Sequence, residues 1–455
     1  MSLRGKFCRR VLVPVRRLAS PKTAQRFRVL RELEESQWWP PDKLRELQAE
    51  RLGAIGRAAW RTPFYGKRFT DCGLSPRHDL TPEDLAKLPP LTKDDIRNRS
   101  ADLIDPSWPR ADLHVHRTGG ATGEPTTVYG STVAESARWA MMARHDRWAR
   151  WDFGERIAIL WGATRDVLEA RKRWFERIRN SVTRSLLWLN AFRMSEERMA
   201  EFVELLNRFK PQSFRAYASA AFFFAQYIEA SKKRLTARPL GVITSAEPLY
   251  PEHRVAIERV FGCPVFNRYG CREVGTLTSE CEEHAGLHVC AEHFMLEVVR
   301  PDLSPCAAGE SGEILVTSLT ERAMPLIRYA IGDFGVIEED QPCPCGRGLP
   351  RLRDIKGRTS DIFRLPGGTL VHGEFFTHLF YGATGVRKFQ VVQNAIDHLE
   401  VKAVVDERFN DAIITAFRRE IEEFLEPGVR VDFRLVADIE PGPTGKHKFT
   451  ISNLS

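Results

Sequence analysis

Residues 264–275 read PVFNRYGCREVG. The apolar start of this stretch predicts a short strand, and Tyr269 and Glu273 follow where the strand ends. An aromatic ring and a carboxylate are therefore both predicted at the end of one strand. Such a ring can stack on adenine and such a carboxylate can bind magnesium, so the stretch is a candidate nucleotide site. Taken separately, each residue could also be a surface salt-bridge or packing residue.

The segments before and after this stretch alternate between strand and helix patterns. Apolar runs at 157–160 and 241–244 predict strands, and residues 197–209 and 220–233 have helical periodicity. A further strand is predicted over 312–317. This alternation of strands and helices is typical of an α/β fold.

The C-terminal part of the chain predicts a second, compact α+β unit. It contains strands near 387–393 and 399–404, a helix over 407–424 and a strand over 430–436. The boundary is expected near 355–361. The 455 residues are thus predicted to form three parts: a basic arm over 1–31, a large domain over 32–356 and a small domain over 357–455.

The N-terminal third of the large domain predicts helices. Residues 25–60 suit two helices separated by Trp38-Trp39-Pro40-Pro41. Short helices are predicted to begin after Thr81 and Thr92, because each is a capping residue followed by acidic residues in the first turn.

The net charge of +8 is concentrated at the N-terminus, where residues 1–31 hold ten Lys or Arg and no Asp or Glu. Pro14 and Pro21 interrupt this segment, which predicts either a solvated flexible arm or a peripheral contact with anionic lipid. We expect no nucleic-acid binding, because basic and aromatic residues do not form a common stripe. We expect no integral membrane segment, because no apolar run approaches about 18 residues.

A glycine-rich segment, 117–126, predicts a phosphate-binding loop. Its glycines let the backbone approach a ligand closely, and its hydroxyls add hydrogen-bond donors for phosphate oxygens. It lacks the lysine-serine or lysine-threonine ending of a nucleoside-triphosphatase loop, and an ordinary glycine-rich turn is the alternative. The candidate ligand-binding residues are Thr118, Gly119, Gly120, Thr122 and Gly123.

Three charged residues complete the candidate site. Asp333 and Arg358 place a carboxylate and a guanidinium where they could meet a ribose and a phosphate. Lys446 stands on a glycine-flanked loop, which could carry it into an active site and out again.

In this order, these elements resemble the adenylate-forming superfamily, and within it the branch of phenylacetate-CoA ligases and capsule-biosynthesis ligase-like proteins. The resemblance spans about 28–450 and implies a large domain of mixed sheets and helices with a small mobile α+β domain. By resemblance, 118–125 is the phosphate loop and Asp333 binds the ribose. Arg358 is the arginine at the start of the hinge segment, and Lys446 is the adenylation lysine. The resemblance also implies a nucleotide-contacting segment and a tyrosine motif, at Ser245, Ala246, Glu247, Pro248, Tyr269, Gly270 and Glu273.

The resemblance implies a ligase that uses ATP, Mg²⁺ held by Glu273, a carboxylic acid and coenzyme A. An acyl-adenylate would form first, and a thiol would then attack it. Two alternatives stay open: an amide ligase with an amine acceptor in surface-polysaccharide biosynthesis, and a nucleotide-binding scaffold without turnover. The sequence departs from the family pattern at Glu124, where many members carry lysine, and at the hinge pair Ser360 and Asp361, where Ser360 replaces an aspartate.

Nine cysteines without disulfide spacing indicate a reducing cytoplasm and a candidate metal site. Tetrahedral Zn²⁺ would suit a site that closes on protein ligands alone, with a structural role. His288 or Cys290 could replace one ligand, and unligated core cysteines are the alternative. The predicted ligands are Cys281, His284, Cys343 and Cys345.

The expected location is the cytoplasm, with peripheral contact at the inner membrane face as a further expectation for the basic arm. A second copy of the chain, forming a homodimer, is a further candidate partner. The sequence does not name the carboxylic acid, because no motif marks the walls of its pocket.

Overall fold

The computed structural model describes the chain from residue 2 to residue 454 apart from a set of gaps. These gaps are 78, 118–125, 162–184, 192–193, 195, 339–340, 359–361, 367–369, 373–375, 377–378, 381–382, 426 and 441–447. The chain forms two compact units, Met1–Ile355 and Lys356–Ser455.

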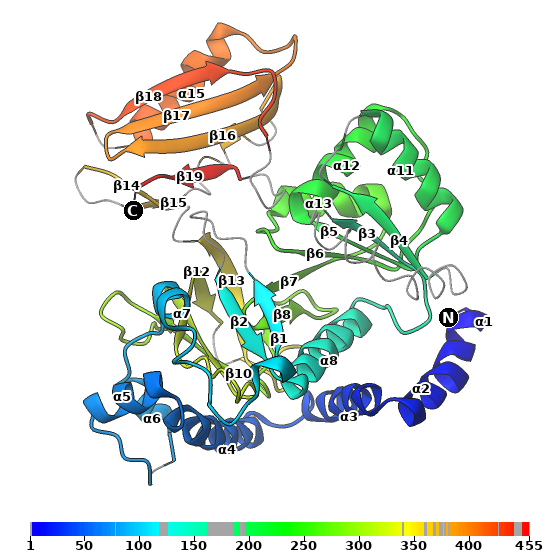
Figure 1. The fold of residues 1–455 in the computed structure, drawn as a ribbon. Coiled ribbons are helices and arrows are strands. Elements are labelled where there is room, and N and C mark those ends of the chain that lie inside the picture. Colours follow the sequence, from blue (N-terminus) through cyan, green and yellow to red (C-terminus); the bar gives the residue numbers. More distant parts are fainter. Residues whose placement is uncertain are drawn as a thin grey trace. The chain divides into compact units, whose positions relative to one another are not determined.

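An eleven-stranded sheet runs through the large unit (Figure 1). Strands β4, β3, β5, β6 and β7 pair in parallel, and β7, β8 and β9 continue the sheet in antiparallel fashion. The α/β class predicted from the alternating patterns is confirmed, and each strand expected in this region is present. The strands, in sheet order, are β10 (Phe294–Val299), β11 (Ser311–Ser318), β12 (Tyr329–Ile337), β13 (Arg351–Arg358), β9 (Leu287–Val289), β8 (Gly275–Glu280), β7 (Val265–Cys271), β6 (Gly241–Ser245), β5 (Ser213–Tyr217), β3 (Ile157–Trp161) and β4 (Leu186–Asn190).

Helices cover the parallel half of this sheet. Phe214 of β5 stacks on Phe261 of α13, with ring centroids 4.9 Å apart. Phe224 of α12 packs against the same pair, and all three side chains are buried. Aromatic rings thus fix the helical layer to the strands that carry the candidate site. The helices of this layer are α11 (Glu196–Phe209), α12 (Ala218–Ala230) and α13 (Pro251–Phe261).

The N-terminal third is helical, as its patterns predict. Thr81 and Thr92 each form a capping box with the aspartate three residues later, which fixes where α6 and α7 begin. Helix α3 packs closely against α8. The helices are α3 (Pro21–Ser36), α4 (Pro41–Trp60), α5 (Pro63–Asp71), α6 (Pro82–Leu85), α7 (Lys93–Arg99) and α8 (Thr132–Trp148), and the hairpin before α8 is β1 (His114–Arg117) with β2 (Thr127–Gly130).

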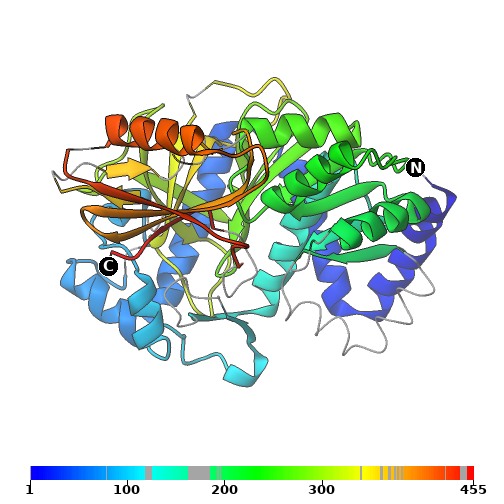
Figure 2. The same ribbon diagram turned by 90° about the horizontal axis from the view of Figure 1, so that it is seen from above.

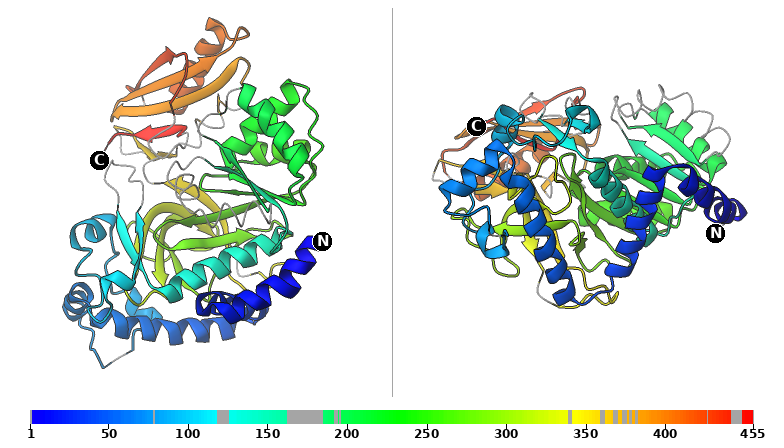
Figure 3. Two further views of the ribbon diagram at one scale, coloured as in Figure 1. Left: turned by 45° about the vertical axis from the view of Figure 1, so that its right-hand side comes forward. Right: turned by 60° about the horizontal axis from the view of Figure 1, so that its bottom comes forward.

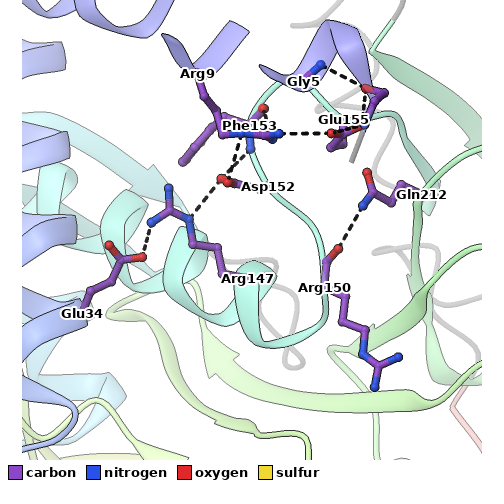
Figure 4. Close-up of polar contacts among 10 residues, drawn as sticks. Gly5, Arg9, Glu34, Arg147, Arg150, Asp152, Phe153, Glu155 and Gln212 are labelled. Atoms are coloured by element: carbon purple, nitrogen blue, oxygen red, sulfur yellow. Dashed lines mark hydrogen bonds and ion pairs between the residues drawn. The ribbon is translucent and has the colours of Figure 1, made fainter. Parts of the chain in front are cut away.

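The basic N-terminus is not the separate arm that its charge predicts. Residues 3–19 form α1 (Leu3–Phe7), a π-helical turn, η1 (Cys8–Leu12), and α2 (Val13–Ala19). Pro14 does not break this helix, because the π turn before it already replaces the α-helical bonding pattern. Pro21 starts α3 instead of interrupting a helix, since Ser20 caps it. The segment docks on the loop at 152–155 (Figure 4).

The small unit is a sheet covered on one face by a helix, as the sequence predicts (Figure 2). Phe417 and Ile421 on α15 are buried in a core with Val391 and Val401 of the central strands. The sheet order is β18-β17-β16-β19, beside a separate β14-β15 hairpin. The elements are β14 (Ile362–Arg364), β15 (Leu370–His372), β16 (Val386–Ala395), β17 (His398–Val405), α15 (Asp411–Phe424), β18 (Arg430–Leu435) and β19 (Thr450–Ser452).

Among the described residues, no helix is both long and apolar enough to cross a membrane.

Candidate active site and candidate metal centre

Two distant strands of the large sheet bring Tyr269 and Asp333 together. Tyr269 lies on β7 and Asp333 on β12, and three strands separate them in the sheet order. In a flat sheet those strands would lie about 19 Å apart. The hydroxyl of Tyr269 nevertheless donates a hydrogen bond to Oδ2 of Asp333, at 2.8 Å. The sheet is therefore strongly curved here, and it closes around the two side chains.

Glu273 is the second carboxylate of this site. The hydroxyl of Tyr329, the first residue of β12, donates a hydrogen bond to Oε1 of Glu273 at 2.8 Å. Both side chains are buried. Burial and the negative charge of Glu273 raise the pKa of Tyr329, so its hydroxyl stays protonated and remains a donor.

The turn between β7 and β8 is held in one conformation. A Cβ added at Gly270 would overlap the carbonyl oxygen of Gly275, so the close approach requires glycine. Arg138 of α8 donates hydrogen bonds to the backbone carbonyls of Arg272 and Glu273. These contacts fix where the Glu273 carboxylate lies relative to the strand.

The segment 245–248 begins with Ser245, the last residue of β6. Ala246 has a φ of 73°, a left-handed conformation that costs an alanine about 1–2 kcal/mol. Glu247 accepts a hydrogen bond on Oε2 from the backbone N–H of Ser219, at 2.9 Å. Backbone strain of this kind concentrates at functional sites. Because the carboxyl ends of parallel strands share one edge, this segment lies on the edge to which β7 contributes Tyr269.

The structure does not place every predicted site residue. Arg358 ends β13, at the start of the small unit, and only its backbone is described. The remaining predicted residues lie outside the described residues: Thr118, Gly119, Gly120, Thr122, Gly123, Lys446, Ser360 and Asp361.

A small cavity of about 20 Å³ lies next to Glu273, large enough for one water molecule. Glu321 lines it and accepts hydrogen bonds from the N–H groups of Ser131 and Ala323, at 2.7 and 2.8 Å. Burial raises the pKa of Glu321. His293 also lines the cavity, and burial lowers its pKa to about 3, so the imidazole is neutral.

Three residues that shape the site were not predicted from the sequence: Tyr329, Arg138 and Glu321. Tyr329 lies four residues before the predicted site residue Asp333, and its aromatic hydroxyl was the available signal. Arg138 and Glu321 carry no local signal, because their contacts are made across the fold.

Four potential metal ligands gather between β9 and the loop at 343–349. Their ligand atoms all lie within 4.8 Å of one another. Cys281 Sγ is 3.8 Å from Cys343 Sγ, and Cys345 Sγ is 3.4 Å from Nε2 of His288. The four residues are Cys281, His288, Cys343 and Cys345.

His288 replaces His284 in this cluster, which corrects the predicted ligand set. His284 has a φ of 50° in the turn before β9, and its Nδ1 lies 3.1 Å from Oε2 of Glu280. His288 lies on β9, where Nδ1 faces the carbonyl of Leu349 at 3.3 Å and Nε2 faces Cys345. A hydrogen bond from Nδ1 to a carbonyl is the usual orientation of a metal-binding histidine.

The donor set fits zinc. Three sulfurs and one imidazole nitrogen are the ligands of a closed tetrahedral site, and spacings of 3.4–3.8 Å match the edges of such a tetrahedron. Burial raises the pKa of the Cys281 and Cys343 thiols, and a bound cation would reverse this effect by favouring the thiolates.

The curved sheet, the tyrosine and the two carboxylates are arranged on the fold of adenylate-forming ligases. A structure of 2-hydroxyisobutyryl-CoA ligase in the postadenylation state matches with a TM-score of 0.73 over 92% of each chain, at 21% identity. The homologues of the chain are phenylacetate-coenzyme A ligases and CapK, so the predicted resemblance is confirmed. The ligase of Thermus thermophilus is 28% identical over 81% of this chain and 83% of its own length.

Protein CapK of Staphylococcus aureus is 25% identical over 86% of this chain and 85% of its own. Residues 364–453 match the family described as the CapK C-terminal domain. This match covers most of the small unit, from the last residue of β14 through β19.

Proposed function

We propose that this protein activates a carboxylic acid with ATP and transfers the acyl group to coenzyme A. The observation that carries the proposal is the pair of hydrogen bonds from Tyr269 to Asp333 and from Tyr329 to Glu273, which join β7 and the turn after it to β12. Homology to phenylacetate-coenzyme A ligases over 72–81% of the chain supports it. Matching structures of 2-hydroxyisobutyryl-CoA ligase are complexes with an acyl-AMP or with acyl-AMP and coenzyme A, which is the chemistry proposed for this chain.

Each residue has a defined role in the proposed first step. The ring of Tyr269 stacks on the adenine, and Asp333 accepts hydrogen bonds from the ribose hydroxyls. Glu273 would hold Mg²⁺, which supplies positive charge against the phosphate oxygens. Tyr329 orients the Glu273 carboxylate through its hydrogen bond. Lys446 donates to the oxygens of the reacting phosphate, where negative charge grows as the substrate carboxylate attacks.

The second proposed step needs a different arrangement of the small unit. The segment at 358–361 would act as the hinge, so that Lys446 leaves the site and the thiol of coenzyme A can enter. The thiolate then attacks the acyl carbonyl and AMP leaves.

Pyrophosphate release, measured against a library of carboxylic acids, tests the function. Wild type should release pyrophosphate with at least one acid and form a thioester when coenzyme A is added. Lys446→Ala should abolish pyrophosphate release and leave thioester formation from a supplied acyl-adenylate largely intact. Equal loss of both steps would contradict the role of Lys446, and ATP binding without any turnover would favour a scaffold.

An amide ligase is the second candidate function. The match to protein CapK over 86% of the chain and the match of residues 364–453 to the CapK C-terminal domain are compatible with it. The same library assay distinguishes the two, because an amide ligase would consume the acyl-adenylate with an amine and not with coenzyme A. A role in surface-polysaccharide biosynthesis is part of this alternative.

We further propose that the cluster of Cys281, His288, Cys343 and Cys345 binds a structural Zn²⁺. Four protein ligands leave no open coordination position, so the ion would hold β8, β9 and the 343–349 loop together without entering the reaction. The cytoplasmic location and the homodimer stay predictions.

A further inference from the structure

The N-terminal helices leave one apolar face uncovered. Five large apolar side chains on residues 3–18 are exposed, at intervals of four, four, four and three residues, which places them on one face. Isolated exposed apolar residues are common on proteins, but a row of five along one helical segment indicates a binding surface. The exposed fractions are Leu3 86%, Phe7 54%, Val11 43%, Val15 58% and Leu18 90%. We call these five residues the apolar stripe.

The opposite face of the helix is fixed to the large unit (Figure 4). Ser2 donates a hydrogen bond from Oγ to Oε2 of Glu155 at 2.6 Å, and Arg9 donates to the carbonyl of Phe153 at 2.9 Å. Arg9 also pairs with Asp152 at 3.5 Å and with Glu155 at 3.4 Å. These contacts set the rotation of the helix, so the apolar stripe stays outward. Figure 3 shows α1 and α2 (dark blue) at the periphery of the large unit.

The same helix is strongly basic. Lys6, Arg10, Arg16 and Arg17 are exposed beside the apolar stripe, and residues 1–31 contain no acidic side chain. An uncovered apolar row next to cations is the pattern of a helix that lies in a membrane interface.

We propose that this face of α1, η1 and α2 binds an anionic lipid bilayer. The apolar stripe enters the boundary of the acyl chains, while Lys6, Arg10 and Arg17 contact the headgroups. From Leu3 to Leu18 the helix is about 22 Å long, which is too short to span the hydrocarbon core. The helix therefore lies along the surface and holds the large unit against it.

Charge argues for a bilayer and against a second copy of the chain. Two copies meeting through this face would bring equal positive charges together without compensating acids, which is unfavourable. An anionic bilayer complements the cations and also accepts the apolar stripe. The apolar stripe on the continuous helix adds to the free energy of membrane binding a contribution that salt does not screen. A purely electrostatic arm would be released from the membrane at high salt.

Vesicle co-sedimentation of the full-length protein tests the proposal. The vesicles are phosphatidylcholine alone and phosphatidylcholine with phosphatidylglycerol, each at low and high salt. Wild type should bind the anionic vesicles at low salt and keep part of that binding at high salt. Replacing Lys6, Arg10 and Arg17 by Gln should weaken binding at low salt about 100-fold, because each cation near such a surface contributes about fivefold.

The apolar contribution has its own variant and control. Phe7→Gln with Leu18→Gln should remove the binding that survives high salt, a loss of roughly tenfold or more. The matched control is Val255→Gln with Leu240→Gln, because those residues are also exposed, at 57% and 43%, and lie outside the helix. The control should bind as wild type does, and all variants should keep the melting temperature of the wild type.

Three results would overturn the proposal. The first is equal binding to anionic and neutral vesicles, and the second is no binding to either. The third is a dimer or an acidic-protein complex, formed without lipid, that Phe7→Gln with Leu18→Gln dissociates. None of these readouts depends on adenylation, so the proposed function can fail while this proposal stands.

Discussion

The hydroxyl of Tyr329 donates a hydrogen bond to Oε1 of Glu273 at 2.8 Å, and both residues are buried in the large unit. A tyrosine that sequence reasoning passed over thus orients the carboxylate proposed to hold Mg²⁺. The contact joins the turn after β7 to the start of β12, so the geometry of the site depends on the curvature of the sheet.

Tyr329→Phe should lower stability by about 1.5–3 kcal/mol, the usual cost of removing a hydrogen bond to a charged group. It should also raise the Mg²⁺ concentration needed for half-maximal pyrophosphate release, because Oε1 of Glu273 is no longer oriented. Denaturant unfolding and a Mg²⁺ titration measure the two effects. Glu273→Gln should raise the Mg²⁺ concentration for half-maximal pyrophosphate release further than Tyr329→Phe does. A stability loss with an unchanged titration would reduce Tyr329 to a purely structural role.

Asp333→Ala should weaken ATP binding at least about tenfold, since ribose hydroxyls then lose a charged acceptor. Tyr269→Phe should weaken it only a few-fold, because the ring that stacks on adenine stays and only the hydrogen bond to Asp333 is lost. Calorimetric titration with ATP gives both values. The ribose role of Asp333 is wrong if the alanine variant binds ATP as tightly as wild type.

Protein purified without a histidine tag should contain about one zinc per chain. His288→Ala should lower the zinc content and the melting temperature together, and Cys343→Ser should do the same. His284→Ala is the matched control, because it lies four residues away but pairs with Glu280. Metal analysis by mass spectrometry decides the site, and a metal-free wild type of full stability would refute it.

Removing zinc with a chelator should lower the melting temperature of wild type and leave that of His288→Ala unchanged. The reason is that a structural ion stabilises only the folded state that provides its ligands. An equal effect on both proteins would mean that the chelator acts elsewhere.

Gly154→Ala should release the N-terminal helix from the large unit. Gly154 has a φ of 87°, and a Cβ there would overlap the Cβ of Cys8 on the docked helix. Gly73→Ala is the control, because Gly73 has a φ of 72° but no atom within 4 Å of an added Cβ. Both variants should lose about 1–2 kcal/mol from backbone strain.

Limited proteolysis distinguishes these two glycine variants. Only Gly154→Ala should be cut faster within residues 3–19, since only this substitution pushes the helix away. Equal cleavage of both variants would show that the helix does not depend on this close approach.

The sequence by itself determined the elements and the class of fold. The capping boxes at Thr81 and Thr92, the strand β7 and the helix α15 follow from local chemistry and periodicity, which act over a few residues. Their ends were less well predicted: β7 continues through Tyr269 to Cys271, and α15 begins at Asp411 instead of residue 407. The order of the motifs along the chain was then enough to show the resemblance to the adenylate-forming superfamily. Local patterns carry this information because the backbone N–H and C=O groups of each helix or strand must form hydrogen bonds, and its apolar face must be buried.

Only the tertiary structure decided which side chains meet. The sequence offered His284 and His288 as ligands, and the direction of β9 selects His288. The charge pattern of the N-terminus predicted a separate arm. In the structure, Ser2 and Arg9 instead donate hydrogen bonds to Glu155, about 150 residues later in the chain. Tyr269 reaches Asp333 because a curved sheet closes a gap of about 19 Å. These contacts depend on the path of the whole chain through space, which no local pattern records.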